Sequence, residues 1–427
     1  MFTTVVLGML FLLSIYPILG AFCWFIGALC YRFIYQHELK SYVDLSIENQ
    51  PFISILVPAH NEEVMIEQTI LYLLNKLNYK NYEVLVVDDG STDKTPQILK
   101  RLQKKHKNLR VIRIEENKGK AHAFNIAISF TRGEYVLSND ADTVPEPDAL
   151  MKYMNYFLSE EGKNYAAVTA NMDVQNRSKI IEKSQTVEFS SIVGAIKRGQ
   201  MATLGVMYAY SGANTMYRKS AVYDVGLFRQ NRATEDISIC WDQQFNGWKA
   251  VFAPEIMFYM NVPHSLKMLY QQRKRWAKGG TEVWLTNLKK VLKHPINNLS
   301  KVVMLTDQTF SIIWSFFYFI TMFIFCYNLA YSFLIQNESQ IIHMFDMAFI
   351  FITYEIIAGF FQLLAALLLD CKGSKLKYLF FAPFYMLFYW QMNALTIVTT
   401  FVPAVKTIMG FGVGTWKSPE RVPMIDK

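Results

Sequence analysis

Two acidic residues in the middle of the chain, Asp140 and Asp142, stand two positions apart just after the strand expected at 134–138. A hard divalent cation such as Mg²⁺ or Mn²⁺ prefers oxygen ligands and commonly takes one or two carboxylates together with phosphate oxygens. We therefore expect the pair to hold a cation that in turn binds a diphosphate. Because acidic residues are also common in solvated loops, the pair alone does not fix this chemistry.

A further acidic cluster consists of Thr234, Glu235 and Asp236. A sugar hydroxyl becomes a nucleophile only if a base removes its proton as the new bond forms. We expect one of the two carboxylates, Asp236 by preference, to act as that base. The cluster also precedes a helical pattern at 237–245, where such residues cap free amide groups, and the two roles are compatible. Asp89, after an earlier apolar run, could accept a hydrogen bond from a base or ribose, although its surroundings also suit a turn.

Amide, cation and indole side chains lie on one helical face, because Gln272, Arg275 and Trp276 are spaced i, i+3 and i+4. Arginine binds phosphate oxygens in a fork, and an aromatic ring packs on the apolar face of a sugar. A membrane-surface belt of Trp and basic residues is an equal alternative. Lys120, at the start of an expected helix, could contact phosphate. No P-loop and no G-x-G-x-x-G motif is present, which disfavours an ATPase or a Rossmann dehydrogenase.

The region 50–260 alternates strand and helix patterns, which predicts an α/β domain with a mostly parallel mixed sheet flanked by helices. Ligands of open α/β sheets bind beyond the carboxyl ends of the strands, where Asp89 and the pair at 140–142 stand. Strands are expected at 53–58, 82–87, 109–114, 134–138 and 166–170, and helices at 62–77, 95–105, 120–130 and 180–197.

Apolar stretches flank this domain, and hydrophobic residues make up 52% of the chain. We divide the chain into an N-terminal transmembrane segment (1–35), the catalytic domain (50–260), amphipathic interface helices (261–301), C-terminal transmembrane helices (302–403) and a tail (404–427). Spans of the C-terminal block are expected at 308–335, 344–370 and 377–403. The net charge of +8 reflects basic residues beside spans, which predicts a domain facing the cytoplasm and no nucleic-acid partner.

The expected topology contains a conflict, since one N-terminal and three C-terminal spans place the basic tail on the side opposite the domain. Either Pro17 divides the first apolar stretch into two spans, or Pro383 and Pro403 mark a re-entrant segment.

Taken in order, the motifs resemble those of processive family 2 inverting glycosyltransferases. The matching segments lie at 57–62, 88–93, 117–125, 140–143, 211–212, 234–236 and 272–276. This resemblance implies a GT-A catalytic domain in which Asn61, Glu62 and Lys120 help to bind the donor, Asp89 the uridine, and Asp140 and Asp142 the diphosphate and metal. It further implies that Asp236 is the base, with Glu235 and Thr234 beside it, and that Gln272, Arg275 and Trp276 frame the acceptor end.

Segments 182–189, 192–198, 275–280 and 415–421 are most similar to the poly-β-1,6-N-acetylglucosamine synthases of that family. The expected activity is processive transfer from UDP-N-acetylglucosamine to a growing biofilm polysaccharide, coupled to its translocation across the bacterial cytoplasmic membrane. Membrane lipids and a small membrane accessory subunit are the expected partners. Open alternatives are a hyaluronan, chitin or cellulose type of synthase with another UDP-sugar, a non-processive lipid-carrier glycosyltransferase, and a non-enzymatic export subunit. His60 and Asn139 depart from the family pattern without removing a carboxylate.

Overall fold

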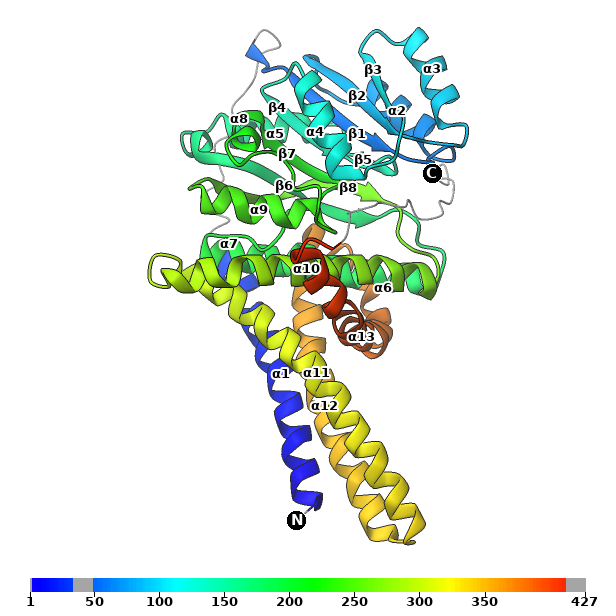
Figure 1. The fold of residues 1–427 in the computed structure, drawn as a ribbon, viewed down its shortest axis with the longest axis vertical. Helices are drawn as coiled ribbons and strands as arrows, with labels where there is room; N and C mark the ends of the chain where they lie inside the picture. Colours follow the sequence, from blue (N-terminus) through cyan, green and yellow to red (C-terminus); the bar gives the residue numbers. More distant parts are fainter. Residues whose placement is uncertain (1, 34–48, 412–427) are drawn as a thin grey trace.

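The computed structural model describes residues 2–33 and 49–411, and it consists of an α/β domain above a stalk of long helices (Figure 1). The stalk contains α1 (Phe2–Phe33), α11 (Leu299–Leu334) and α12 (Glu338–Leu369). These three helices run away from the domain in the same general direction (Figure 1). The domain itself lies between α1 and α11 in the sequence.

An eight-stranded mixed sheet forms the centre of the domain, in the order β3-β2-β1-β4-β7-β6-β8-β5. The first four of these strands pair in parallel, and β7 and β5 pair antiparallel to their neighbours. The strands are β1 (Ile53–Ala59), β2 (Tyr82–Asp89), β3 (Leu109–Ile114), β4 (Tyr135–Asn139), β5 (Thr143–Pro145), β6 (Tyr165–Val174), β7 (Asn214–Arg218) and β8 (Lys249–Met260). The expected mostly parallel mixed sheet is confirmed, and β5, β7 and β8 are strands that the sequence patterns did not reveal.

Helices cover both faces of the sheet, so β1 and β2 are buried along their whole length, as their continuous apolar runs require. α2 shows how a helix is held there, because Ile66, Ile70 and Leu73 recur at helical spacing and are all buried. The other helices of the domain are α3 (Thr95–Lys105), α4 (Lys120–Phe130), α5 (Ala149–Phe157), α6 (Ile180–Phe189), α7 (Ile196–Leu204), α8 (Lys219–Tyr223), α9 (Glu235–Phe245) and α10 (Leu266–Lys293); α2 itself spans Ile66–Asn75.

Three helices in the described part of the chain are long and apolar enough to cross a membrane: Leu7–Phe33, Leu299–Leu334 and Glu338–Gly373. α1 continues through Pro17, so the first apolar stretch is one helix rather than two. α13 (Ala382–Ile408) covers the stretch where a further span was expected, but it is not among the three. It packs along α10 below the domain, where its polar residues Gln391 and Asn393 interrupt the apolar pattern (Figure 1).

A buried carboxylate joins the end of α12 to the domain. Asp370 is fully buried and accepts hydrogen bonds from Asn171 Nδ2 at 2.7 Å, Ser190 Oγ at 2.8 Å and Lys375 Nζ at 2.7 Å. Asn171 belongs to β6, and Ser190 begins the π-helical turn Ser190–Ala195 between α6 and α7. Because buried charges are stable only when they are paired and hydrogen-bonded, these contacts fix the end of α12 to the α/β domain.

Candidate active site

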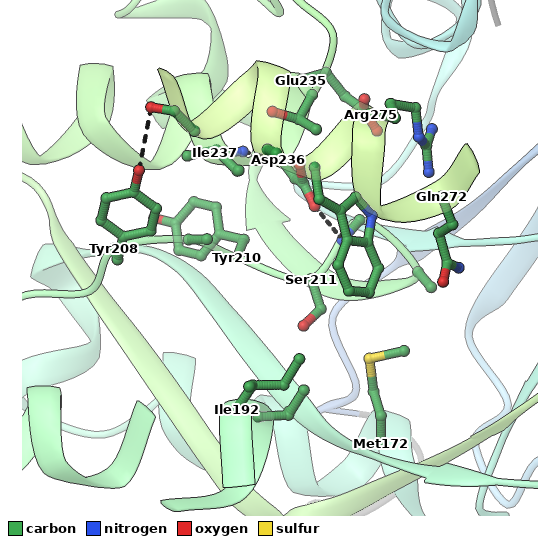
Figure 2. Close-up of a pocket in the computed structure, with 18 of the residues that line it drawn as sticks. Met172, Ile192, Tyr208, Tyr210, Ser211, Glu235, Asp236, Ile237, Gln272 and Arg275 are labelled. Carbon is green, nitrogen blue, oxygen red and sulfur yellow. Dashed lines mark hydrogen bonds between the residues drawn. The ribbon is translucent and has the colours of Figure 1, made fainter. Parts of the chain in front are cut away.

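A cavity of about 380 Å³ lies at the carboxyl end of β4, between the domain and the helices below it. Its walls come from the residue after β4, the segment before β7, β6, the stretch from the end of α6 to α7, the start of α9, the middle of α10, and single turns of α11 and α13. The residues that line it and carry the argument are Lys120, Asp140, Lys197, Ser211, Gly212, Thr234, Glu235, Asp236, Gln272, Arg275, Trp276, Gln308 and Asn393. Figure 2 shows Glu235, Asp236, Gln272 and Arg275 on one side of it and Met172 and Ile192 on the other.

Asp236 lies in the first turn of α9 with its carboxylate held by two backbone amides. Oδ2 accepts a hydrogen bond from Gly212 N at 2.9 Å, and Oδ1 accepts one from Ile237 N at 2.9 Å. Burial and the neighbouring Glu235 raise the pKa of Asp236 to about 6, while Lys120 and Arg275 act in the opposite direction. A fixed carboxylate with a pKa just below neutral is suited to general-base catalysis.

The capping interpretation of this cluster is not supported for Thr234. Thr234 occupies the N-cap position of α9, but its side chain makes no capping hydrogen bond. Its Oγ1 is buried and has no hydrogen-bond partner among the described residues. Thr234 packs tightly against Gly279 of α10, since a Cβ at position 279 would lie 1.9 Å from Thr234 Oγ1. The absent side chain lets α10 press against the start of α9, which brings the two predicted motifs into one site.

Lys120 connects two of the acidic clusters. It begins α4, and its Nζ donates to Asp140 Oδ1 at 2.6 Å and lies 3.3 Å from Glu235 Oε1. Burial alone would lower the pKa of Lys120, but Asp140 and Glu235 raise it above its ordinary value. The residue is therefore a buried cation held between Asp140 and Glu235.

Gly212 permits this convergence. A Cβ at Gly212 would lie 3.1 Å from Lys120 Nζ, 3.2 Å from Asp236 Oδ2 and 3.2 Å from Glu235 Oε1. The carbonyl of Gly212 accepts a hydrogen bond from Lys120 Nζ at 3.2 Å, and its amide donates to Asp236. Any larger residue would push apart the groups that the proposed chemistry needs.

Asp140 and Asp142, the expected cation ligands, differ in their surroundings. Asp140 faces the cavity, whereas Asp142 is buried outside its lining, with Oδ1 3.3 Å from Thr143 Oγ1. Across residues 2–33 and 49–411, no group of three or more His, Cys, Asp or Glu side chains could hold a metal ion. Two hard oxygen donors fit Mg²⁺ or Mn²⁺ only if the substrate supplies further oxygens, as a diphosphate does.

Asn61, Glu62 and Asp89 lie outside the cavity lining, at the carboxyl ends of β1 and β2. Asp89 accepts hydrogen bonds from Lys118 N at 3.2 Å and Gly119 N at 3.0 Å, and burial raises its pKa. Asn61 Oδ1 accepts from Thr92 N at 2.8 Å, and the amide of Glu62 donates to Thr95 Oγ1 at 2.9 Å. These contacts order the loops that would surround a nucleotide.

Gln272, Arg275 and Trp276 all line the cavity from α10, as their helical spacing predicts. The carbonyl Oε1 of Gln272 is buried without a hydrogen-bond partner among the described residues, so it can accept one from a ligand. Arg273, which the sequence did not single out, lies over the Trp276 ring at 4.0 Å and pairs with Glu188 of α6 at 2.5 Å. This buried pair orients Trp276.

Lys197 and Ser211 line the cavity but were not named as candidate site residues, although they lie in the family-like segments 192–198 and 211–212. Lys197 Nζ donates to Ser211 Oγ at 2.7 Å, and both residues line the cavity. Burial lowers the pKa of Lys197 to about 8, against the attraction of Asp236. A signal that could have found Lys197 is the basic pair 197–198 at the end of a largely apolar helical pattern.

The chain is similar to known glycosyltransferases in sequence and in fold. Residues 54–226 match the model of glycosyl transferase family 2. A poly-β-1,6-N-acetyl-D-glucosamine synthase of Staphylococcus epidermidis is 34% identical over 423 residues, which covers 96% of this chain and 97% of that protein. The enzyme of the same name from Staphylococcus aureus (strain COL) is 32% identical over 422 residues, covering 96% of this chain and 97% of that one.

Among solved structures, the mannosyltransferase PcManGT from Pyrobaculum calidifontis in complex with GDP-Man and Mn²⁺ has a similar fold. It superposes with a TM-score of 0.56 at 18% identity, over 88% of this chain and 99% of that one. The near-complete match to the staphylococcal synthases and the family match of the catalytic domain agree with each other. The chain belongs to glycosyl transferase family 2, and it is a membrane-associated glycosyltransferase.

Proposed function

We propose that the protein transfers N-acetylglucosamine from UDP-N-acetylglucosamine to the growing end of a β-1,6-linked poly-N-acetylglucosamine chain. The observation that carries this proposal is the juxtaposition of Asp236, Lys120 and Asp140 in one cavity that Trp276 also lines. The names of the staphylococcal relatives, which match over nearly their whole length, supply the sugar and the linkage.

In the reaction, Asp236 takes the proton from the C6 hydroxyl of the acceptor as that oxygen attacks the anomeric carbon of the donor. The bond from the anomeric carbon to the diphosphate oxygen breaks, its electron pair leaves with UDP, and the configuration at the carbon inverts. Lys120 lies close to the developing negative charge, where a preorganised cation is most effective. Asp140 and Asp142 would hold Mg²⁺ or Mn²⁺, which neutralises charge on the departing diphosphate when bound.

Gln272, Arg275 and Trp276 would position the acceptor, with the indole face against a sugar ring. The same cavity reaches Gln308 of α11 and Asn393 of α13, so polar groups continue from the catalytic residues toward the stalk. We infer that the polymer leaves along this path, which supports repeated addition without release. A small membrane accessory subunit and surrounding lipids would complete the assembly.

The domain would face the cytoplasm, where UDP-sugars are made. Lys289, Lys290 and Lys293 end α10 just before α11, as the positive-inside rule requires of a cytoplasmic side. With α1, α11 and α12 as spans, the end of α13 lies on the same side as the domain. In a cysteine-free chain, Lys406→Cys should then be protected from a membrane-impermeant maleimide in intact cells and Gln336→Cys labelled; the reverse pattern contradicts this orientation.

The activity is tested by incubating membranes that contain the full chain with individual radiolabelled UDP-sugars. We expect polymer only from UDP-N-acetylglucosamine, and digestion of that polymer by a β-1,6-specific hexosaminidase but not by chitinase or hyaluronidase. Short, lipid-extractable products would instead indicate a non-processive enzyme. Polymer from a different UDP-sugar would overturn the assignment of the donor.

A further inference from the structure

Lys197 is a buried cation for which the described chain provides one hydrogen-bond acceptor. Its side chain is only 7% exposed, and its Nζ donates to Ser211 Oγ at 2.7 Å. No ion pair joins it to a carboxylate within residues 2–33 and 49–411. An ammonium group has three donors, and burying it without acceptors is costly. Its position in the wall of the cavity provides a reason, because a bound substrate can supply the missing acceptor.

Apolar side chains adjoin this cation on the same wall. Val193 precedes Lys197 by one helical turn, and Ile192 and Met172 also line the cavity there, below Ser211 in the view of Figure 2. Ile192 and Val193 belong to the π-helical turn Ser190–Ala195, a rare distortion that recurs at functional sites. A hydrogen-bond donor beside an apolar surface fits a ligand group that has a carbonyl oxygen next to a methyl group.

The backbone at Ser211 and Gly212 separates this feature from the diphosphate end of the cavity. Lys120 contacts the Gly212 carbonyl and Asp140, while Lys197 contacts the Ser211 hydroxyl. The catalytic carboxylate of Asp236 is held by the Gly212 amide between them. We therefore place the donor on the Lys120 side of Asp236 and the acceptor sugar on the Lys197 side.

We propose that Lys197 and Ser211, together with the apolar wall of Met172, Ile192 and Val193, bind the N-acetyl group of the acceptor's terminal sugar. This inference rests on the proposed function, since it assumes an N-acetylglucosamine acceptor. The acetamide carbonyl accepts a hydrogen bond from Lys197, and its methyl group packs on the apolar side chains.

The same lysine disfavours a sugar that lacks the acetyl group. A free 2-amino group is protonated near neutral pH, offers no acceptor, and would place a second positive charge beside Lys197. Selection would therefore combine attraction of the correct group with repulsion of the wrong one. Lys197 is on this view a specificity-determining residue of the acceptor site.

The test compares two acceptors, the β-1,6-linked tetramers of N-acetylglucosamine and of glucosamine, with UDP-N-acetylglucosamine as donor and the purified full chain. The wild-type protein should favour the acetylated tetramer in kcat/KM by about 100-fold, and Lys197→Met should reduce this preference by about tenfold or more, chiefly through KM. Ser211→Ala should reduce it less. Lys104→Met, at an exposed position of α3, is the matched control and should leave the preference unchanged.

Each outcome bears on the inference. An unchanged acceptor preference in Lys197→Met contradicts it, even if the overall rate falls. A change in the choice between UDP-N-acetylglucosamine and UDP-glucose, with the acceptor preference intact, assigns Lys197 to the donor and also overturns it. If Lys197→Met does not fold, Lys197→Gln provides the same comparison. Failure of the wild-type protein to use UDP-N-acetylglucosamine would instead refute the proposed function, and this inference with it.

Discussion

Replacing Asp236 with Asn tests whether this carboxylate is the base, because the substitution keeps its shape and removes its ability to take a proton. Loss of a general base typically costs about 10²- to 10⁴-fold in rate. The hydrogen bonds from Gly212 N and Ile237 N show that Asp236 is held in place before substrate arrives. We therefore expect polymer synthesis by Asp236→Asn to fall at least about 100-fold, while affinity for UDP changes little.

The pKa of Asp236 gives the same hypothesis a pH dependence. With a pKa of about 6, the carboxylate is about 90% ionised at pH 7 and about 10% ionised at pH 5. The value of kcat/KM should accordingly rise through a midpoint near pH 6 and reach a plateau above pH 7. A profile without this rise would count against Asp236 as the group that accepts the proton.

As the pH rises, the contribution of Asp236 to folding stability should fall while the activity rises. The folded-state pKa of Asp236 is raised, so its stabilising contribution is present below the unfolded value of 3.8 and is lost as the pH rises through about 6. At about 1.4 kcal/mol per pKa unit, the loss above pH 7 is about 3 kcal/mol. The Asn side chain has only one acceptor oxygen, so it loses one of the two hydrogen bonds from the backbone. This loss destabilises the variant by about 1 kcal/mol or more and offsets part of the gain. Asp236→Asn should therefore be as stable as the wild type or more stable at pH 8, and this advantage should vanish at pH 4.

The assay measures UDP release and polymer formation by the purified full chain from pH 5 to 8.5, alongside thermal unfolding. Asp224→Asn, an exposed acidic position in the same domain, is the control for loss of charge. Glu235→Gln separates the two carboxylates, because Glu235 contacts Lys120 and should retain more activity than Asp236→Asn. A rate for Asp236→Asn within tenfold of the wild type would refute the assignment, whatever its stability.

Three further predictions follow from the packing and the charges around the site. Gly279→Ala places a Cβ 1.9 Å from Thr234 Oγ1, so we expect a loss of about 1–3 kcal/mol in unfolding free energy and a fall in activity, both larger than for Gly280→Ala, where the nearest atom is 3.2 Å away. Glu188→Ala leaves Arg273 buried without its partner and should lower the free energy of unfolding by about 3–5 kcal/mol. A double variant with Met at positions 188 and 273 should recover part of this loss, because no unpaired charge is then buried, and thermal unfolding measures both changes. Chelation by EDTA should lower the transfer rate about 100-fold, with recovery on adding Mg²⁺ or Mn²⁺ but not Ca²⁺ at equal concentration, and metal-independent transfer would contradict the role given to Asp140.

The first half of the sheet was predictable from local pattern alone. β1 to β4 are short apolar runs between amphipathic helices, and a parallel sheet covered on both faces requires such runs. Since all four strands are parallel, their carboxyl ends lie at one edge, which places Asp89 and Asp140 near each other. α3 and α4 have the bounds that the sequence predicted, 95–105 and 120–130.

The second half was less predictable, because its strands pair through contacts between distant segments. β7 is a five-residue strand inserted antiparallel between β4 and β6, and β8 runs parallel to β6 with two register shifts. No short sequence pattern predicts either of these strand pairings. Lys197 was not singled out for the same reason, since it comes from a helix whose sequence pattern shows mainly burial, whereas the polar Asn393 stands out within an apolar stretch.

For α13, the hydropathy of the sequence does not distinguish a membrane span from a helix packed against the domain. A stretch that is apolar enough to suggest a span can also be a helix that lies beneath a domain, and only its neighbours distinguish the two. Tyr385 and Tyr389 of α13 pack with Ile181 of α6, and about one and two turns after Tyr389, Asn393 and Ile397 line the cavity. From 385 to 397 the helix advances about 18 Å, and both ends of this length lie against the domain or its cavity. We therefore propose that α13 lies along the domain and does not cross the membrane; with only α1, α11 and α12 as spans, the conflict that four spans created would not arise.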